Sequence, residues 1–572
     1  MAANLAKAIL FEVEQVTMVR EHLISLIRQA VEPLLCGTGV EIQGDIHLET
    51  PPSKEFGDFS TNTAMVLASQ LKRPPREVAS ALIAAMQKIS PAFVEKIELA
   101  GPGFINFFLH PSWLHDSLRE ILDSGENYGR SNIGEGRKVL LEFVSANPNG
   151  PIHIGHGRGG VIGDVLANLL SAVGYKVDRE FYINDAATSA QMQKFGRSLE
   201  ARYFQLQGIE REMPEDGYFG DYVIELAQEI LDSEGDRYNQ MSEEERLRLF
   251  TDLARQKMIE HQQQTLERFG IVFDNWFSEQ TLVDSGRITE AIEALKATGF
   301  TYEEEGALWL RSTAFGDDKD RVLVRNNGIP TYLASDVAYH INKFERGYDL
   351  LIDIWGPDHH GYITRTKAAL QALGYSPERL HIFVHQIVRL ISDGELVRAS
   401  KRAGDLITLD EILDAVGKDV ARFFYLMRSH DSHLDFDLEL ARNQSQENPV
   451  FYVQYAHARI CSILREAGDR AKESTFAKAD FSLLNHDEEV ALMRKLADLP
   501  EEIALAATEF APHRLTRYAQ ELAGAFHGFY TECRVLSDDE KLTAARLALV
   551  QATRIVLAIT LRLLGVSAPE RM

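Results

Sequence analysis

One segment, residues 141–175, constrains the fold more than any other part of the chain. Its residues 141–144, Leu-Glu-Phe-Val, predict a short buried strand, and the sequence Asn-Pro-Asn-Gly-Pro at 147–151 is typical of a turn. From about Gly157 onwards, Val161, Val165 and Leu169 recur at helical spacing, and Gly174 ends the helix. The segment therefore predicts a strand, a loop and a helix in succession, which is the building unit of an α/β protein.

Two histidines, His153 and His156, stand at the entrance of this predicted helix. A helix N-terminus offers free N–H groups and partial positive charge, which suit a phosphate group, and the histidine rings add hydrogen-bond donors. Gly155 and Gly157 would let a nucleotide approach the backbone. The pattern favours a nucleotide-binding site, and the alternative is a glycine-rich helix start in an ordinary α/β protein.

The four residues His153-Ile154-Gly155-His156 resemble the HIGH signature, the ATP motif of class I aminoacyl-tRNA synthetases and related nucleotidyltransferases. The longer string EFVSANPNGPIHIGHGR, residues 142–158, resembles one family closely, the bacterial arginyl-tRNA synthetases. The resemblance covers nearly all of the chain after about residue 18. It implies ATP-dependent ligation of L-arginine to tRNA(Arg) through an arginyl-adenylate, with transfer to the 2′-hydroxyl of the terminal adenosine. In this family, activation of arginine generally requires bound tRNA.

A second signature is the sequence Arg-Ala-Ser-Lys-Arg at 398–402. It resembles the KMSKS loop of class I synthetases, whose lysines hold the ATP phosphates, although an arginine and an alanine replace the first two residues. The flanking string GELVRASKRAGDLITLDEILDAVG matches the family over its whole length. The resemblance implies that Lys401 acts with His153 and His156 on the phosphates, and that Arg398 and Ser400 contact ATP. The alternative is a solvated basic loop.

Selection of arginine requires carboxylates and a hydrogen-bonding rim, because the guanidinium is planar and always charged. In IPTYLASDVAYH, Tyr332 and Asp336 are four residues apart and share one face of a helix. By resemblance, Glu142 and Asp336 grip the guanidinium beside Tyr332, and the other end of arginine is held near the first signature and near WGPDHHGYITR. The residues assigned to arginine are therefore Glu142, Ser145, Asn147, Tyr332, Asp336 and His360. The alternative for each acid is a surface or capping carboxylate.

The string WGPDHHGYI ends a predicted strand, so Gly356 and Asp358 are expected to contact the adenosine of ATP. Its adjacent histidines lack the spacing of a zinc site, and no third ligand is evident, so no protein-bound metal is expected. Mg²⁺ is expected to arrive with ATP, carried mainly by phosphates and water. The family's Asn-Asp-Ala-Gly is replaced here by Asn-Asp-Ala-Ala at 184–187, which leaves the geometry of that loop open.

The 572 residues are too many for one hydrophobic core. Residues 1–17 read as a leader or upstream extension, and 18–115 as an α+β domain that in the family contacts tRNA. Residues 130–435 read as a Rossmann-like catalytic domain with strands at 139–144, 177–182, 350–355 and 381–388 and a helical insertion at about 190–290. Residues 436–572 read as an all-α anticodon-binding bundle. Its residues Phe451, Tyr452, Tyr455, His457 and Arg459 could stack on RNA bases or equally form a packing face.

The formal net charge of −25 argues against a general polyanion binder, so tRNA would have to meet local basic patches. Three scattered cysteines fit a reducing cytoplasm rather than a disulfide framework. The apolar residues 547–566 contain two arginines and read as a packed helix, so no membrane contact is expected. The family expectation is a monomer. Two alternatives remain, namely a catalytically silent RNA-binding relative and a class I synthetase for another amino acid.

Overall fold

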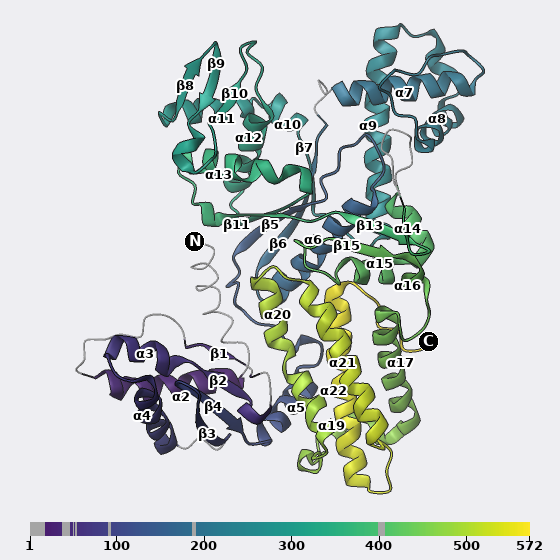
Figure 1. The fold of residues 1–572 in the computed structure, drawn as a ribbon. Helices are drawn as coiled ribbons and strands as arrows, with labels where there is room; N and C mark the ends of the chain where they lie inside the picture. Colours follow the sequence, from purple (N-terminus) through teal and green to yellow (C-terminus); the bar gives the residue numbers. More distant parts are fainter. Residues whose placement is uncertain are drawn as a thin grey trace.

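The computed structural model describes residues 18–36, 46–49, 51, 54–89, 93–185, 190–397 and 407–572. A parallel sheet lies at the middle of the molecule (Figure 1). Two lobes stand above this sheet, a bundle of long helices extends below it, and a small N-terminal domain lies beside the bundle. The leader at 1–17 and the second signature at 398–402 fall outside the described residues, so both remain predictions.

The N-terminal domain is an antiparallel sheet covered by helices. The strand order is β1-β2-β4-β3. Leu23, Leu67, Leu82 and Phe107 are among the buried residues that join the helices to the sheet, which fits the expected α+β class. The elements are α2 (Met18–Leu35), β1 (Leu48–Glu49), β2 (Phe59–Thr61), α3 (Thr63–Leu71), α4 (Pro75–Ile89), β3 (Val94–Ala100) and β4 (Phe104–Leu109).

The central sheet has five parallel strands in the order β12-β11-β5-β6-β7. Val139 to Phe143 of β5 are all buried, as expected for a parallel strand covered on both faces. The helix α6 (Ile154–Ala172) follows β5, so the predicted strand, loop and helix are confirmed. The strands are β5 (Lys138–Phe143), β6 (Lys176–Ile183), β7 (Asn275–Ser278), β11 (Leu350–Trp355) and β12 (Leu380–Val384).

The single strand predicted at 381–388 is wrong, because the chain turns within it. β12 ends at Val384, and the next strand joins a separate three-stranded sheet of order β14-β13-β15. Arg158 holds the turn by donating to the carbonyl oxygens of Gln386 at 2.9 Å and Ser429 at 2.8 Å. An apolar run alone does not reveal such a change of sheet. The strands of the second sheet are β13 (Val388–Ser392), β14 (Glu395–Leu396) and β15 (Leu434–Asp437).

The two upper lobes are insertions with separate cores. The first is helical, with α7 (Ala190–Leu206), α8 (Asp221–Glu234) and α9 (Glu243–Arg268). The helical insertion expected at about 190–290 stops at Arg268, because β7 returns to the main sheet. The second lobe was not predicted from the sequence. It contains α10 (Gln280–Asp284), α11 (Arg287–Ala297), β8 (Thr301–Glu304), β9 (Ala307–Leu310), β10 (Arg321–Val324), α12 (Tyr332–Glu345) and α13 (Ile363–Ala372).

The C-terminal bundle and the central sheet share one hydrophobic core. The residues of this core range in sequence from Leu114 to Val566. The long helix α22 is the one described helix long and apolar enough to span a membrane, and 67% of that stretch is buried inside the protein. The prediction of a packed helix there is confirmed. The remaining helices are α5 (Ser112–Ser124), α14 (Leu409–Val416), α15 (Lys418–Tyr425), α16 (Leu438–Arg442), α17 (Pro449–Ala467), α18 (Glu473–Phe476), α19 (Asp487–Ala497), α20 (Leu499–Thr508), α21 (His513–Glu532) and α22 (Glu540–Leu564).

Buried polar contacts tie the helix of the first signature to the bundle. Asp164 of α6 forms a buried ion pair with Arg422 of α15. The Nε atom of Arg422 donates to the carbonyl oxygen of Leu564 at 3.1 Å, and the amide of Asn168 donates to that of Leu563 at 3.0 Å. The last turn of α22 therefore supports α6 directly.

Candidate active site

The two histidines of the first signature cap the helix that follows them. β5 ends at Phe143, and α6 begins at Ile154 with His153 as its N-cap. Nδ1 of His153 accepts from the backbone N–H of Gly155 at 3.0 Å and of His156 at 3.4 Å, and Nδ1 of His156 accepts from the N–H of His153 at 3.4 Å. Because both Nδ1 atoms accept, neutral rings carry their proton on Nε2, which can donate to an anion.

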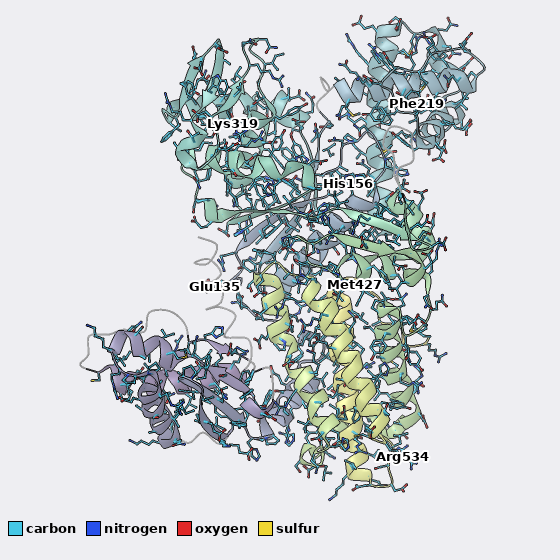
Figure 2. All side chains as sticks on the ribbon, in the orientation of Figure 1. Glu135, His156, Phe219, Lys319, Met427 and Arg534 are labelled. Atoms are coloured by element: carbon cyan, nitrogen blue, oxygen red, sulfur yellow. The ribbon has the colours of Figure 1, made fainter. Side chains whose placement is uncertain are left out.

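The histidine rings stack with their centroids 3.6 Å apart at the N-terminus of α6. His156 lies near the middle of the molecule, between the upper lobes and the bundle (Figure 2). A Cβ on Gly155 would come within 3.0 Å of the His153 ring, so the absence of a side chain lets that ring fold back onto the backbone. Two Nε2 donors beside a helix N-terminus form a site of the right polarity for phosphate.

Gly157 was predicted to let a nucleotide approach the backbone. In the structure it is buried and faces the protein interior. Its N–H donates to the carbonyl oxygen of His153 at 3.2 Å. A Cβ at this position would lie 2.9 Å from Leu409 and 3.0 Å from the hydroxyl of Tyr425. Gly157 therefore allows α6 to pack closely against α14 and α15, and its N–H is already used.

The segment that follows the second signature returns beside the first. The N–H of Ile154 donates to the carbonyl oxygen of Ile407 at 3.0 Å, and the N–H of Leu409 donates to that of Ile152 at 2.8 Å. Arg398, Ser400 and Lys401 themselves lie outside the described residues, so their predicted roles remain predictions.

The segment expected to contact adenosine lies at the same edge of the sheet. β11 pairs with β5 in parallel, so the carboxyl ends of these strands are neighbours. Gly356 follows β11 as the N-cap of a short 3₁₀ helix, Pro357–Tyr362, and no atom lies within 4 Å of where its Cβ would be. Asp358 and His360 are exposed on this turn. The structure thus brings both predicted ATP segments to one edge.

A cluster of acidic side chains with excess negative charge lies between α12, β6 and the end of β7. Tyr332 is the first residue of α12 and is 66% exposed, and Asp336 lies one turn further on. Burial above all, together with the carboxylates of Glu142 and Glu279, raises the pKa of Asp336 to about 7. The hydroxyl of Tyr182 donates to Glu279, whose pKa is also raised, mainly by burial.

Glu279 was not identified from the sequence, although it is 6% exposed and close enough to Asp336 to raise the pKa of that carboxyl group. Its N–H donates to the carbonyl oxygen of Ile183 at 3.0 Å, and Asp185 holds its two neighbours by accepting from the hydroxyl of Ser278 at 2.8 Å and from the N–H of Gln280 at 3.2 Å. Asp185 lies in the sequence Asn-Asp-Ala-Ala at 184–187, which differs from the family's Asn-Asp-Ala-Gly only at its last residue. Among the described residues, neither Asp336 nor Glu279 forms an ion pair. A cation would therefore be favoured between them.

Glu142 is already paired with a lysine, whereas the sequence predicted that it binds the guanidinium of arginine. Its Oε2 accepts from Nζ of Lys343 at 2.5 Å, and its Oε1 accepts from the hydroxyl of Ser145 at 2.8 Å. Ser145 in turn accepts from the N–H of Tyr182 at 3.1 Å. Asn147 is exposed at the start of the loop, with its carbonyl oxygen held by Gln262 at 3.1 Å. Glu142 therefore supports one side of the pocket, while Asp336 and Glu279 carry its uncompensated charge.

The aromatic residues of α17 divide between surface and interior. The guanidinium carbon of Arg459 lies 5.3 Å from the ring centroids of Tyr455 and Tyr530, and these three side chains reach the surface. His457 is buried, and its Nδ1 lies 2.9 Å from the carbonyl oxygen of Pro569. His457 therefore belongs to the packing of the bundle, whereas Tyr455 and Arg459 remain accessible to a ligand.

The described residues contain no group of three or more histidine, cysteine or acidic side chains placed to hold a metal ion.

Comparison with known proteins gives matches along the whole described chain. Residues 21–109 match the arginyl tRNA synthetase N terminal domain, 117–428 the catalytic domain of tRNA synthetases class I (R), and 453–572 the DALR anticodon binding domain. The chain is 52% identical over 530 residues to an arginine–tRNA ligase of Heliobacterium modesticaldum, covering 92% of this chain and 93% of the relative. An arginine–tRNA ligase of Caldanaerobacter subterraneus is also 52% identical, with coverage of 92% and 94%.

A solved structure gives the same result at the level of the fold. The arginyl-tRNA synthetase of Thermus thermophilus superposes with a TM-score of 0.76 at 25% identity, covering 97% of this chain and all of that one. The likeness extends to the three-part arrangement of N-terminal domain, parallel-sheet catalytic domain and helical C-terminal domain. With about half of its residues shared with relatives over most of its length, the chain belongs to the arginyl-tRNA synthetase family.

Proposed function

We propose that the chain activates L-arginine with ATP as an adenylate and transfers it to the 2′-hydroxyl of the terminal adenosine of tRNA(Arg). The overall reaction, ligation of arginine to tRNA, follows from its family. The observation that supports the residue-level proposal is the pair of acids Asp336 and Glu279, which lack ion-pair partners among the described residues. They lie near the carboxyl ends of β5 and β7, the edge of the sheet from which the chain leaves β5 towards the histidine-capped helix. No observation favours a silent RNA-binding relative or another amino acid.

In this proposal the acidic pocket binds the guanidinium of arginine. Asp336 and Glu279 supply the negative charge, and the hydroxyls of Tyr182 and Tyr332 complete a rim of hydrogen-bonding groups. Arginine then brings its own cation to two buried carboxyl groups, which removes their mutual repulsion. The α-amino and carboxylate end of arginine is assigned to Ser145 and Asn147, with Glu142 behind them and His360 across the sheet edge.

ATP is assigned to the N-terminus of α6. His153 and His156 donate from Nε2 to the phosphates, and Gly155 leaves the adjacent backbone open. The arginine carboxylate attacks the α-phosphorus and pyrophosphate leaves, so negative charge grows on the phosphoryl oxygens and is met by fixed donors. Lys401 adds a charge to this site, while Gly356, Asp358, Arg398 and Ser400 position the nucleotide. Mg²⁺, carried by the phosphates, supplies further positive charge.

The C-terminal bundle is assigned to the binding of tRNA. The accessible pair Tyr455 and Arg459 suits the stacking of unpaired bases, in line with the DALR anticodon binding domain matched at 453–572. We further propose that the enzyme acts as a cytoplasmic monomer, which sedimentation equilibrium with and without tRNA would test.

The first test is arginine-dependent exchange of labelled pyrophosphate into ATP, measured with and without tRNA(Arg). Exchange only when tRNA is present would support a tRNA-dependent activation step. Exchange without tRNA would keep the activity and contradict that dependence. No exchange with arginine by folded protein, when another amino acid supports it, would refute the assigned specificity.

A further inference from the structure

Three carboxylates lie side by side across the central sheet. Asp353 of β11 is in register with Glu142 of β5, and Glu142 is in register with Glu180 of β6. All three are buried, with Asp353 and Glu180 fully inaccessible to solvent. Neighbouring like charges repel one another, so this row requires cations placed against it.

The helix α12 supplies those cations. Lys343, with 0% exposure, donates from Nζ to Glu142 at 2.5 Å and to Asp353 at 2.7 Å. One turn later, Arg346 donates to both oxygens of Glu180, at 2.5 and 2.8 Å. Burial works against the charge of Lys343, but Asp353 and Glu142 outweigh it and raise the pKa of its ammonium group. The ammonium group is therefore a fixed, permanent charge.

The contact between Lys343 and Glu142 continues towards the substrate. The second oxygen of Glu142 accepts from the hydroxyl of Ser145, which accepts from the backbone N–H of Tyr182. Ser145 has a φ of +40°, a left-handed conformation that its hydrogen bonds must hold. A chain of contacts thus runs from the interior of α12 to the loop that precedes the first signature.

We propose that Lys343 is a positioning residue for arginine, which acts by fixing the orientation of Glu142 and, through it, the Ser145 loop. Lys343 is inaccessible to a ligand, so it acts through its contacts, and of its two carboxylate partners only Glu142 continues to the Ser145 loop. The inference rests on the proposed arginine pocket. It assigns the lysine no contact with either substrate.

The test measures KM for arginine and for ATP separately, in pyrophosphate exchange with tRNA present. Lys343→Met keeps the length of the side chain and removes its charge, and it should raise the arginine KM by about tenfold or more while the ATP KM changes by less than about twofold. Arg346→Met is the matched control, because it removes a cation from the same carboxylate row without touching Glu142. The control should leave the arginine KM within about twofold of the wild-type value.

A double-mutant cycle decides whether the effect passes through Glu142. If it does, adding Lys343→Met to Glu142→Gln should leave the arginine KM as it is in Glu142→Gln alone. This comparison also serves if Lys343→Met does not fold, because Glu142→Gln removes one of the two carboxylates that the lysine compensated, and Asp353 keeps its hydrogen bond with His340.

Three results would overturn the inference. They are an unchanged arginine KM in folded Lys343→Met, an equal rise in Arg346→Met, and additive effects in the cycle. An unchanged arginine KM in Asp336→Asn would instead refute the pocket itself, so the two failures can be told apart.

Discussion

Replacing Asp336 by asparagine is expected to weaken arginine binding and to stabilise the free protein at the same time. The carboxyl group of Asp336 has a pKa of about 7, chiefly because it is buried and also because Glu142 and Glu279 face it. Ionising it in the absence of substrate is therefore unfavourable. Asparagine keeps the shape of the side chain and removes the negative charge. The same charge is the one that we expect to bind the guanidinium of arginine.

The size of both effects follows from the pKa. A rise from 3.8 to about 7 is about 3 units, and at 1.36 kcal/mol per unit it sets a ceiling of about 4 kcal/mol on the stability gained by removing the charge. Relaxation and water around the side chain reduce this to about 1–3 kcal/mol, or a rise in Tm of about 1–3 °C for a chain of 572 residues. Loss of charge-assisted hydrogen bonds to the guanidinium, about 2–4 kcal/mol, should raise the arginine KM by about 30- to 1000-fold.

The sign of the pH dependence is fixed by the direction of the shift. A carboxyl group whose pKa is higher in the folded state binds protons more tightly there, so the stability of the free protein falls as the pH rises from about 4 to about 7. The difference in Tm between Asp336→Asn and the wild type should therefore be small near pH 4 and largest above pH 7. In the wild type, kcat/KM for arginine should rise through about pH 7 as Asp336 ionises.

Differential scanning fluorimetry of the free proteins over this pH range, together with pyrophosphate exchange at varied arginine, measures both effects. Wild-type protein should gain stability from added arginine, and the variant should gain much less. A variant that is less stable than the wild type at pH 8, or that keeps the wild-type arginine KM, would refute the reasoning.

Three further substitutions test other parts of the site. Lys401→Ala should lower kcat in pyrophosphate exchange, because its contacts strengthen in the transition state, and an unchanged kcat would exclude it from the mechanism. Gly157→Ala would bring a methyl group within 2.9 Å of Leu409; it should lower Tm by the equivalent of about 1–3 kcal/mol, whereas a raised ATP KM at unchanged Tm would contradict the packing role. Arg422→Met leaves buried Asp164 with Arg179 as its one ion-pair partner among the described residues and should cost up to about 3–5 kcal/mol in urea unfolding, and a loss below about 1 kcal/mol would show that the pair with Arg422 is dispensable.

The parts of the site that sequence reasoning located are those with local patterns. The strand predicted at 139–144 is observed at Lys138–Phe143, and the helix expected from about Gly157 begins three residues earlier, at Ile154. His153 was expected at the helix entrance and is the N-cap. Turn residues, apolar period and capping side chains all act within a few residues of one another, so the sequence displays them directly.

The parts that were missed depend on contacts between distant segments. Glu279 follows β7, a four-residue strand within a stretch assigned to a helical insertion, and no local pattern distinguishes it from a surface acid. Lys343 lies in an amphipathic helix, where a lysine is normally exposed; its burial is decided by acids on β5 and β11, 201 and 10 residues away. The turn at Gln386 depends likewise on Arg158, 228 residues away.

The support that α22 gives to α6 has a consequence for protein synthesis. Asp164, in the helix capped by His153, is paired with Arg422, and Arg422 donates to the carbonyl oxygen of Leu564. During translation, some 400 residues separate the emergence of these two ends from the ribosome. The last buried contacts of α6 can therefore form only after almost the entire chain has been synthesised, and until then the helix lacks the support of α22.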